Sequence, residues 1–143
     1  MASQEIRRMT DTLSKAQRSA NMRAVRSRNT QPEMRVRQMV HGLGYGFRLH
    51  WGELPGKPDL AFPGRRKVIF VHGCFWHQHK GCRRASVPQS NVVFWRTKLD
   101  RNATRDADQF AAIKKRGWGV LVVWECEINR KRRLKARLRR FLR

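Results

Sequence analysis

The sequence predicts an α/β domain in which a central mixed β-sheet is flanked by helices. Two short apolar segments stand either side of a tight turn, a pattern typical of a β-hairpin. A third apolar segment follows a long helical stretch, and a helix that crosses over a sheet joins parallel strands. The hairpin and the crossover together require both antiparallel and parallel pairs in one sheet.

The length of 143 residues fits a single domain. Residues 1–14 are polar and charged without periodicity, so we expect a flexible arm there, followed by one domain over residues 15–143. No apolar run approaches the roughly 18 residues of a membrane span, and the first residues lack the apolar stretch of a secretory signal. We therefore expect a cytoplasmic protein that does not interact with membranes.

The elements of the first half begin with a basic stretch and a well-marked helix. The basic stretch, residues 15–28, can form a short helix. The clearest helix start is Thr30, because Glu33 follows it in a capping-box pattern. Alternating apolar residues predict a strand over 45–49. The hairpin strands are expected at 59–62 and 67–71.

The second half predicts two helices, one strand and a last helix. Residues 91–98 and 102–116 have helical patterns, and the apolar run 120–124 suits a buried central strand. Residues 129–143 alternate leucines with lysines and arginines, which predicts an amphipathic basic helix with its charge toward solvent or phosphate.

The charge of the chain points to a polyanionic partner. Thirty-three Lys and Arg stand against ten Asp and Glu, which gives a formal net charge of +23. Solubility alone asks for a net charge of about 2 to 8 in a small domain. Nucleic acid is therefore the expected partner.

Residues 71–82 hold three of the five histidines and two of the three cysteines. The spacing Cys74-x4-His79-x2-Cys82 suits zinc, and Cys126, just beyond the apolar run 120–124, can supply a fourth ligand. The alternative is that these are buried free cysteines of a reduced protein.

The same segment, together with upstream acids, also offers catalytic groups. Asp59 follows a Pro-Gly turn at a strand start, where it can hold a hard cation such as Mg²⁺, although a plain turn aspartate fits the pattern equally well. Glu33 is the other well-placed acid. His72 or His77 can remove a proton from water near neutral pH, or can ligate zinc instead.

Three large aromatic residues accompany these groups. Phe75 and Trp76 lie between the candidate metal ligands, and Trp95 lies farther along the chain. They can form core packing, or they can wedge into a base stack and kink a duplex.

Four segments of the sequence resemble the very short patch repair (Vsr) DNA mismatch endonucleases. They are Asn21-Met-Arg-Ala-Val-Arg-Ser-Arg-Asn-Thr30, Leu54-Pro-Gly-Lys-Pro-Asp59, Val68-Ile-Phe-Val-His-Gly-Cys-Phe-Trp-His77, and Gly117-Trp118 with Val122-Val-Trp-Glu-Cys126. The resemblance implies a fold similar to the restriction endonucleases. It also implies Mg²⁺-dependent nicking of one strand of duplex DNA 5′ of the thymine in a T:G mismatch left by deamination of 5-methylcytosine. Such an enzyme would act as a monomer on nucleoid DNA, and downstream repair proteins would complete the repair.

The resemblance also assigns roles to residues. Asp59 and the backbone carbonyl of Val71 would hold Mg²⁺, His77 would be the catalytic base, and His72 with Glu33 would support them. The remaining residues form two sets: structural zinc ligands Cys74, His79, Cys82 and Cys126, and DNA-contacting residues Phe75, Trp76, Trp95, Asn102, Asp106, Arg23 and Arg26.

Two departures from the family pattern leave alternatives open. Two residues separate His79 from Cys82 where the family commonly has fewer, so the zinc loop can differ in shape, and the heavy positive charge leaves the preferred DNA sequence open. One rival interpretation is a zinc-stabilised nucleic-acid-binding module without catalysis. Another is a restriction-type nuclease that cuts unmismatched DNA.

Overall fold

A four-stranded mixed sheet forms the centre of the computed structural model, which describes residues 29–143. The expected arm at 1–14 and the basic stretch at 15–28 lie outside the described residues. The strand order is β1 (Arg48–Leu49), β2 (Leu60–Phe62), β3 (Lys67–His72) and β4 (Gly119–Trp124). The β1–β2 and β2–β3 pairs are antiparallel, whereas β3 and β4 are parallel. The predicted hairpin and crossover are both confirmed.

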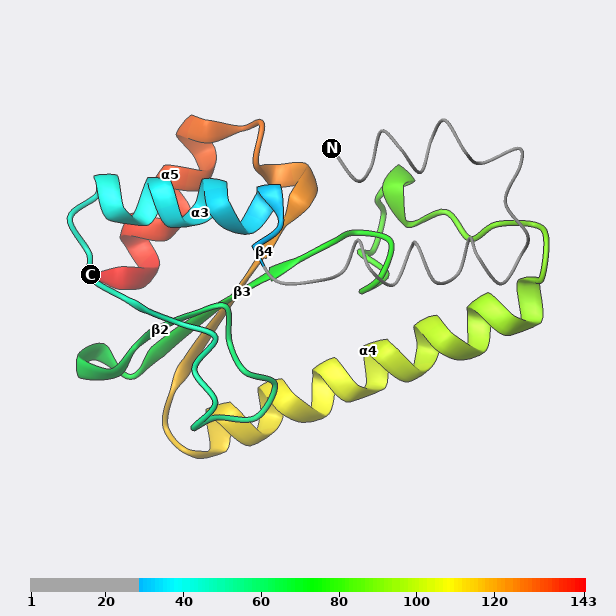
Figure 1. The fold of residues 1–143 in the computed structure, drawn as a ribbon, viewed down its shortest axis with the longest axis horizontal. Coiled ribbons are helices and arrows are strands. Elements are labelled where there is room, and N and C mark those ends of the chain that lie inside the picture. Colours follow the sequence, from blue (N-terminus) through cyan, green and yellow to red (C-terminus); the bar gives the residue numbers. More distant parts are fainter. Residues whose placement is uncertain (1–28) are drawn as a thin grey trace.

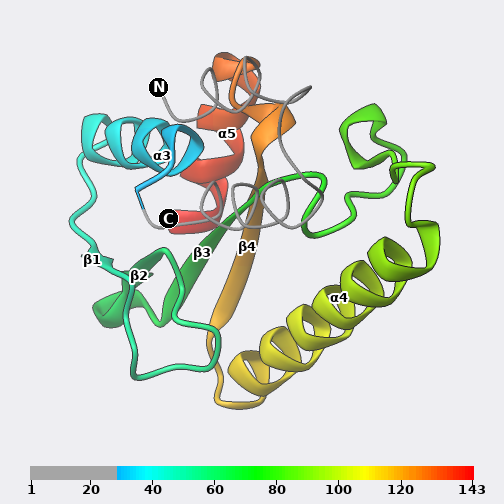
Figure 2. The same cartoon turned by 45° about the vertical axis from the view of Figure 1, so that its right-hand side comes forward.

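Three helices cover the two faces of this sheet, as Figures 1 and 2 show. Helices α3 (Gln31–Gly42) and α5 (Lys131–Leu142) lie on one face, and α4 (Val92–Lys115) lies on the other. One core cluster joins α3 and α5 to the sheet, and a second joins α4 to it. On β3, Ile69 belongs to the first cluster while Val68 and Phe70 belong to the second, which is the alternation expected of a strand buried on both faces.

The start of α3 is the one predicted from its cap. Thr30 Oγ1 accepts a hydrogen bond from the Glu33 N–H at 3.5 Å, and the Glu33 carboxylate accepts one from the Asn29 N–H at 3.1 Å. The cap thus holds Glu33 in the first turn, where it is only 6% exposed. This position brings the carboxylate to the end of the sheet that carries the candidate site.

The prediction of two helices over 91–98 and 102–116 is wrong, because α4 is continuous. No Gly or Pro interrupts residues 92–115, so nothing in the chain stops the helix at residue 99. Its buried residues recur at helical spacing along the whole length: Trp95, Leu99, Asn102, Asp106 and Ile113.

Three further boundaries also differ from the predictions. The strand expected at 45–49 is reduced to Arg48–Leu49, because Tyr45 and Phe47 pack against the first core cluster without joining the strand ladder. β4 is the last strand in the order within the described residues, not a central one, and five of its six residues are only partly buried. The final helix begins at Lys131, not at Asn129. None of the helices formed by residues 29–143 has the length and apolarity needed to cross a membrane.

Candidate active site and metal centres

The candidate active site lies where β3 ends and the loop toward α4 begins. Asp59 directly precedes β2, and its Oδ2 accepts a hydrogen bond from the Val71 N–H at 2.7 Å. Two neighbouring pockets open here, and both are lined by Glu33, Val71, His77 and Arg105. The structure therefore brings together Glu33, Asp59, Val71, His72 and His77, all of which the sequence nominated from segments far apart.

Burial dominates the electrostatics of Asp59. It raises the pKa of the carboxyl from 3.8 to about 7, an effect that the Val71 N–H opposes and the nearby Glu33 carboxylate reinforces. An aspartate with such a pKa is only partly ionised near neutral pH. A bound cation would favour the ionised form, so the site has the electrostatic character of a cation-binding position.

Glu33 belongs to a network at the same edge. Its Oε2 accepts a hydrogen bond from Arg37 Nη2 at 3.3 Å and lies 3.7 Å from His50 Nε2. The ligand atoms of Glu33, His50 and Asp59 all lie within 4.8 Å of one another. The two carboxylates of this group supply oxygen ligands of the kind that Mg²⁺ prefers, so the residues fit the expected ion.

His50 was not nominated by sequence reasoning. Its backbone N–H donates to the Asp59 carbonyl at 3.2 Å, which places the two residues opposite each other where β1 meets β2. His50 could have been nominated from the sequence because it lies directly opposite a nominated acid in an antiparallel pair. That inference requires the correct register of the two strands.

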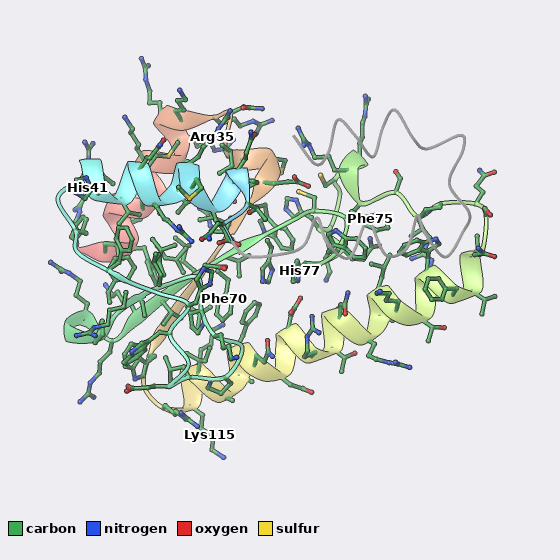
Figure 3. The ribbon with its side chains drawn as sticks, viewed as in Figure 1. Arg35, His41, Phe70, Phe75, His77 and Lys115 are labelled. Carbon is green, nitrogen blue, oxygen red and sulfur yellow. The ribbon has the colours of Figure 1, made fainter. Side chains whose placement is uncertain are left out.

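His77 is oriented by an acid from helix α4. Its Nδ1 lies 2.5 Å from Oδ2 of Asp106, which α4 contributes. When Nδ1 carries the proton that is donated to the carboxylate, Nε2 keeps its lone pair and can accept a proton from water. Figure 3 shows His77 between the end of the sheet and α4. The resemblance nominated Asp106 as a DNA-contacting polar residue near the active site, but it did not predict this pairing.

His72 lies directly against His77. The two rings stack with centroids 3.6 Å apart and planes 8° from parallel. Burial, with a further contribution from His77, lowers the pKa of His72 to about 3. His72 is therefore neutral at physiological pH, and its ring supports the His77 ring without adding a positive charge.

The nominated DNA-contacting aromatics form one cluster beside this pair. Phe75 and Trp76 are half-buried, and their ring centroids lie 5.5 and 6.0 Å from that of Trp95. Trp95 is only 8% exposed, so it supports the other two rings from beneath. Asn102 Nδ2 donates to the Trp76 carbonyl at 3.3 Å and so fixes the loop that carries these aromatics. The other nominated DNA contacts, Arg23 and Arg26, lie outside the described residues.

The four nominated zinc ligands converge on one point. The ligand atoms of Cys74, His79, Cys82 and Cys126 all lie within 4.8 Å of one another. His79 Nδ1 is 3.6 Å from Cys74 Sγ and 3.4 Å from Cys126 Sγ. A tetrahedral zinc with bonds of about 2.3 Å to sulfur and about 2.0 Å to nitrogen requires a sulfur–nitrogen edge of about 3.6 Å, so the set fits zinc. The His79 ring also stacks on Trp124 at 4.1 Å.

Glu125 connects this metal centre to the candidate active site. Its Oε1 accepts a hydrogen bond from the Cys74 N–H at 3.1 Å, and it lines the same pocket as His77. It directly precedes Cys126, so one short segment holds a candidate zinc ligand and one wall of the pocket. Sequence reasoning had not nominated Glu125.

Comparison with known proteins agrees with this geometry. The family model described as DNA mismatch endonuclease Vsr matches residues 10–84. The type II nicking enzyme V.XorIIP of Xanthomonas oryzae pv. oryzae is 51% identical over 134 residues, covering 94% of this chain and 98% of the relative. The DNA mismatch endonuclease Vsr of Escherichia coli is 41% identical over 126 residues, covering 88% of this chain and 80% of the relative. The type II nicking enzyme V.NmeAIP of Neisseria meningitidis is 37% identical over 135 residues, covering 94% and 96%. The chain therefore belongs to the Vsr family of DNA endonucleases.

Proposed function

We propose that this protein nicks one strand of duplex DNA 5′ of the thymine in a T:G mismatch and so initiates very short patch repair of deaminated 5-methylcytosine. The observation that carries the proposal is the His77–Asp106 pair, which lines one pocket together with buried Glu33 and partly buried Asp59. A general base next to a cation-binding carboxylate is the machinery of metal-assisted phosphodiester hydrolysis.

Each residue of the site has its own role in the proposed reaction. Nε2 of His77 removes a proton from the attacking water, and the Asp106 carboxylate stabilises the imidazolium that results. The water oxygen bonds to phosphorus as the bond from phosphorus to the 3′ oxygen breaks, which leaves a 5′-phosphate and a 3′-hydroxyl. Mg²⁺ held by Asp59 and the Val71 carbonyl would supply positive charge for the phosphate oxygens. Arg105, which lines both pockets, can bind the same phosphate.

The wider arrangement supports the remaining parts of the proposal. Helices on both faces of a mixed sheet, with acids at one end of the hairpin, are compatible with a fold of the restriction-endonuclease type. Zinc at Cys74, His79, Cys82 and Cys126 would fix the loop that carries Phe75 and Trp76. Those two rings would enter the base stack beside the mismatch. We propose a monomer with one domain over residues 15–143 that acts on cytoplasmic nucleoid DNA.

A nicking assay on supercoiled plasmid that carries a T:G mismatch separates this enzyme from a binding module without catalysis. Wild-type protein with Mg²⁺ should produce open circles, and EDTA should stop it. Binding of the plasmid without any Mg²⁺-dependent nicking would instead identify a zinc-stabilised binding module.

A second candidate function is a restriction-type nuclease, which has the same hydrolytic chemistry but cuts unmismatched DNA. Two of the three relatives named above are type II nicking enzymes, which favours testing DNA contexts broadly. A panel of labelled duplexes, with each mismatch and its paired counterpart in several flanking sequences, decides between them. Equal cleavage of paired and mismatched duplexes would support the restriction-type nuclease.

A further inference from the structure

Helix α5 carries a charge that neither the fold nor the proposed chemistry uses. Its 12 residues include seven cations and no acid. Among the residues that the structure describes, Arg137 is the only one of the seven in an ion pair, which it forms with Glu127. The other six are exposed: Lys131, Arg132, Arg133, Lys135, Arg139 and Arg140.

The positive charge destabilises α5. Three cations occupy the first turn, where the helix dipole disfavours positive charge, and no side chain caps the N-terminus. Like charges also stand four residues apart, as at Lys131 and Lys135, and each such pair costs about 0.2–0.5 kcal/mol. Burial of Leu134, Leu138 and Leu142, each at most 1% exposed, holds the helix in place. The cations therefore do not stabilise α5, and a role in stability does not account for them.

The cations are arranged on the side of α5 that faces away from the core. The buried leucines recur every four residues, and the helical period places Arg140 nearly opposite them, with Arg132 and Arg139 together on one flank of the exposed side. A helix of this length spans about 18 Å. Because duplex DNA carries one charge per about 1.7 Å of its axis, this row can face several phosphates at once.

A basic track connects this row to the candidate active site. The hollow beside the start of α5 is lined by Arg83, Arg130 and Arg133. The next hollow is lined by Arg35 and Arg84, and it shares Glu125 with the pocket of His77. Arg35 Nη1 also donates to Asn129 Oδ1 at 3.4 Å, just ahead of α5, and Figure 3 shows Arg35 beside the segment that leads into this helix.

We propose that the outer face of α5 is a second DNA-binding surface, which holds the backbone of the same duplex at a distance from the nick. The proposal rests on duplex DNA being the substrate. A protein partner is disfavoured because no large apolar side chain of α5 is exposed, whereas protein interfaces are enriched in aromatic residues. A membrane surface is disfavoured because the apolar face of the helix is buried in the core, where lipid cannot reach it.

The test compares two full-length triple variants with the same loss of charge. One is Arg132→Gln, Arg139→Gln and Arg140→Gln on α5. The control is Arg48→Gln, Lys114→Gln and Lys115→Gln, three exposed residues on β1 and at the far end of α4, where Figure 3 places Lys115. Circular dichroism establishes that both variants are folded. Binding is then measured over a range of salt on a duplex of about one helical turn and on one of about four turns.

On the long duplex, the α5 variant should bind more weakly than the control. Its slope of log K against log salt should be shallower by up to about 2.7, at about 0.9 per lost phosphate contact. On the short duplex, which can fill only the active site, the two variants should bind alike. Equal affinities of both variants for the long duplex would overturn the proposal, as would an equal loss on both duplexes. Because binding is measured apart from nicking, a wild-type protein that binds but does not nick refutes the proposed function without deciding the role of α5.

Discussion

His77 and Asp106 come from different elements, 29 residues apart in the chain, yet their side chains lie 2.5 Å apart. The loop after β3 supplies the histidine, and the middle of α4 supplies the aspartate. This contact orients the His77 ring and leaves Nε2 as the nitrogen that would take up a proton in the proposed mechanism. The proposed catalysis therefore depends on the packing of α4 on the sheet.

Replacement of Asp106 by Asn should lower the nicking rate about 10²- to 10⁴-fold, because the imidazole would lose both its orientation and its stabilising charge. Affinity for DNA should change little. Single-turnover kinetics at saturating protein measures the rate, and Asp108→Asn, an exposed neighbour on the same helix, is the matched control. An Asp106→Asn enzyme as fast as the control would remove Asp106 from the site.

Asp59→Ala should abolish nicking and leave DNA binding intact, because the carboxylate is the proposed Mg²⁺ ligand and Mg²⁺ affinity should be lost with it. Nicking and gel-shift assays on the same duplex measure the two properties, with exposed Asp100→Ala as the control. If the variant nicks at the wild-type rate, Asp59 is not the metal ligand.

The raised pKa of Asp59 predicts how stability depends on pH in metal-free protein. Asp59 has a pKa of about 7 in the fold and an ordinary value of 3.8, so between these values the folded state binds the extra proton. The free energy of unfolding contributed by this group therefore falls as pH rises through that window. Asp59→Asn removes the effect, so its melting temperature relative to wild type should rise from about pH 4 to about pH 8. A constant difference over this range would contradict the shift.

Mg²⁺ affinity should follow the same ionisation. Below pH 7 the cation must displace the Asp59 proton, so the Mg²⁺ concentration for half-maximal nicking should fall as much as tenfold per pH unit as pH rises. Above about pH 7 it should level off. Mg²⁺ titrations of the nicking rate at several pH values measure this, and a midpoint independent of pH would show that Asp59 does not control the site.

Cys126→Ser should remove bound zinc and lower the melting temperature, because Cys126 joins the end of β4 to the loop that holds the other three ligands. Elemental analysis of the purified variant gives the zinc content. Zinc content equal to wild type would exclude Cys126 from the ligand set.

Local patterns in the sequence were enough to predict some of this structure. The cap at Thr30, the hairpin and the parallel strand after α4 all depend on near neighbours in the chain, and each is confirmed. The His77–Asp106 contact depends instead on the register of α4 against the sheet. The sequence predicted two helices with a break between residues 98 and 102, so the register of α4 against the sheet could not be predicted. The His50–Asp59 pairing could not be predicted either, because most of the predicted first strand packs on the core without pairing to β2.

Mismatch-specific nicking can be measured on two duplexes of the same sequence, one with a T:G pair and one with a T:A pair at the same position, each labelled on either strand. With Mg²⁺, the protein should make a single nick 5′ of the thymine in the T:G duplex only, with a 5′-phosphate and a 3′-hydroxyl at the break. An intact T:G duplex, or equal cleavage of the two duplexes, would contradict the proposed function.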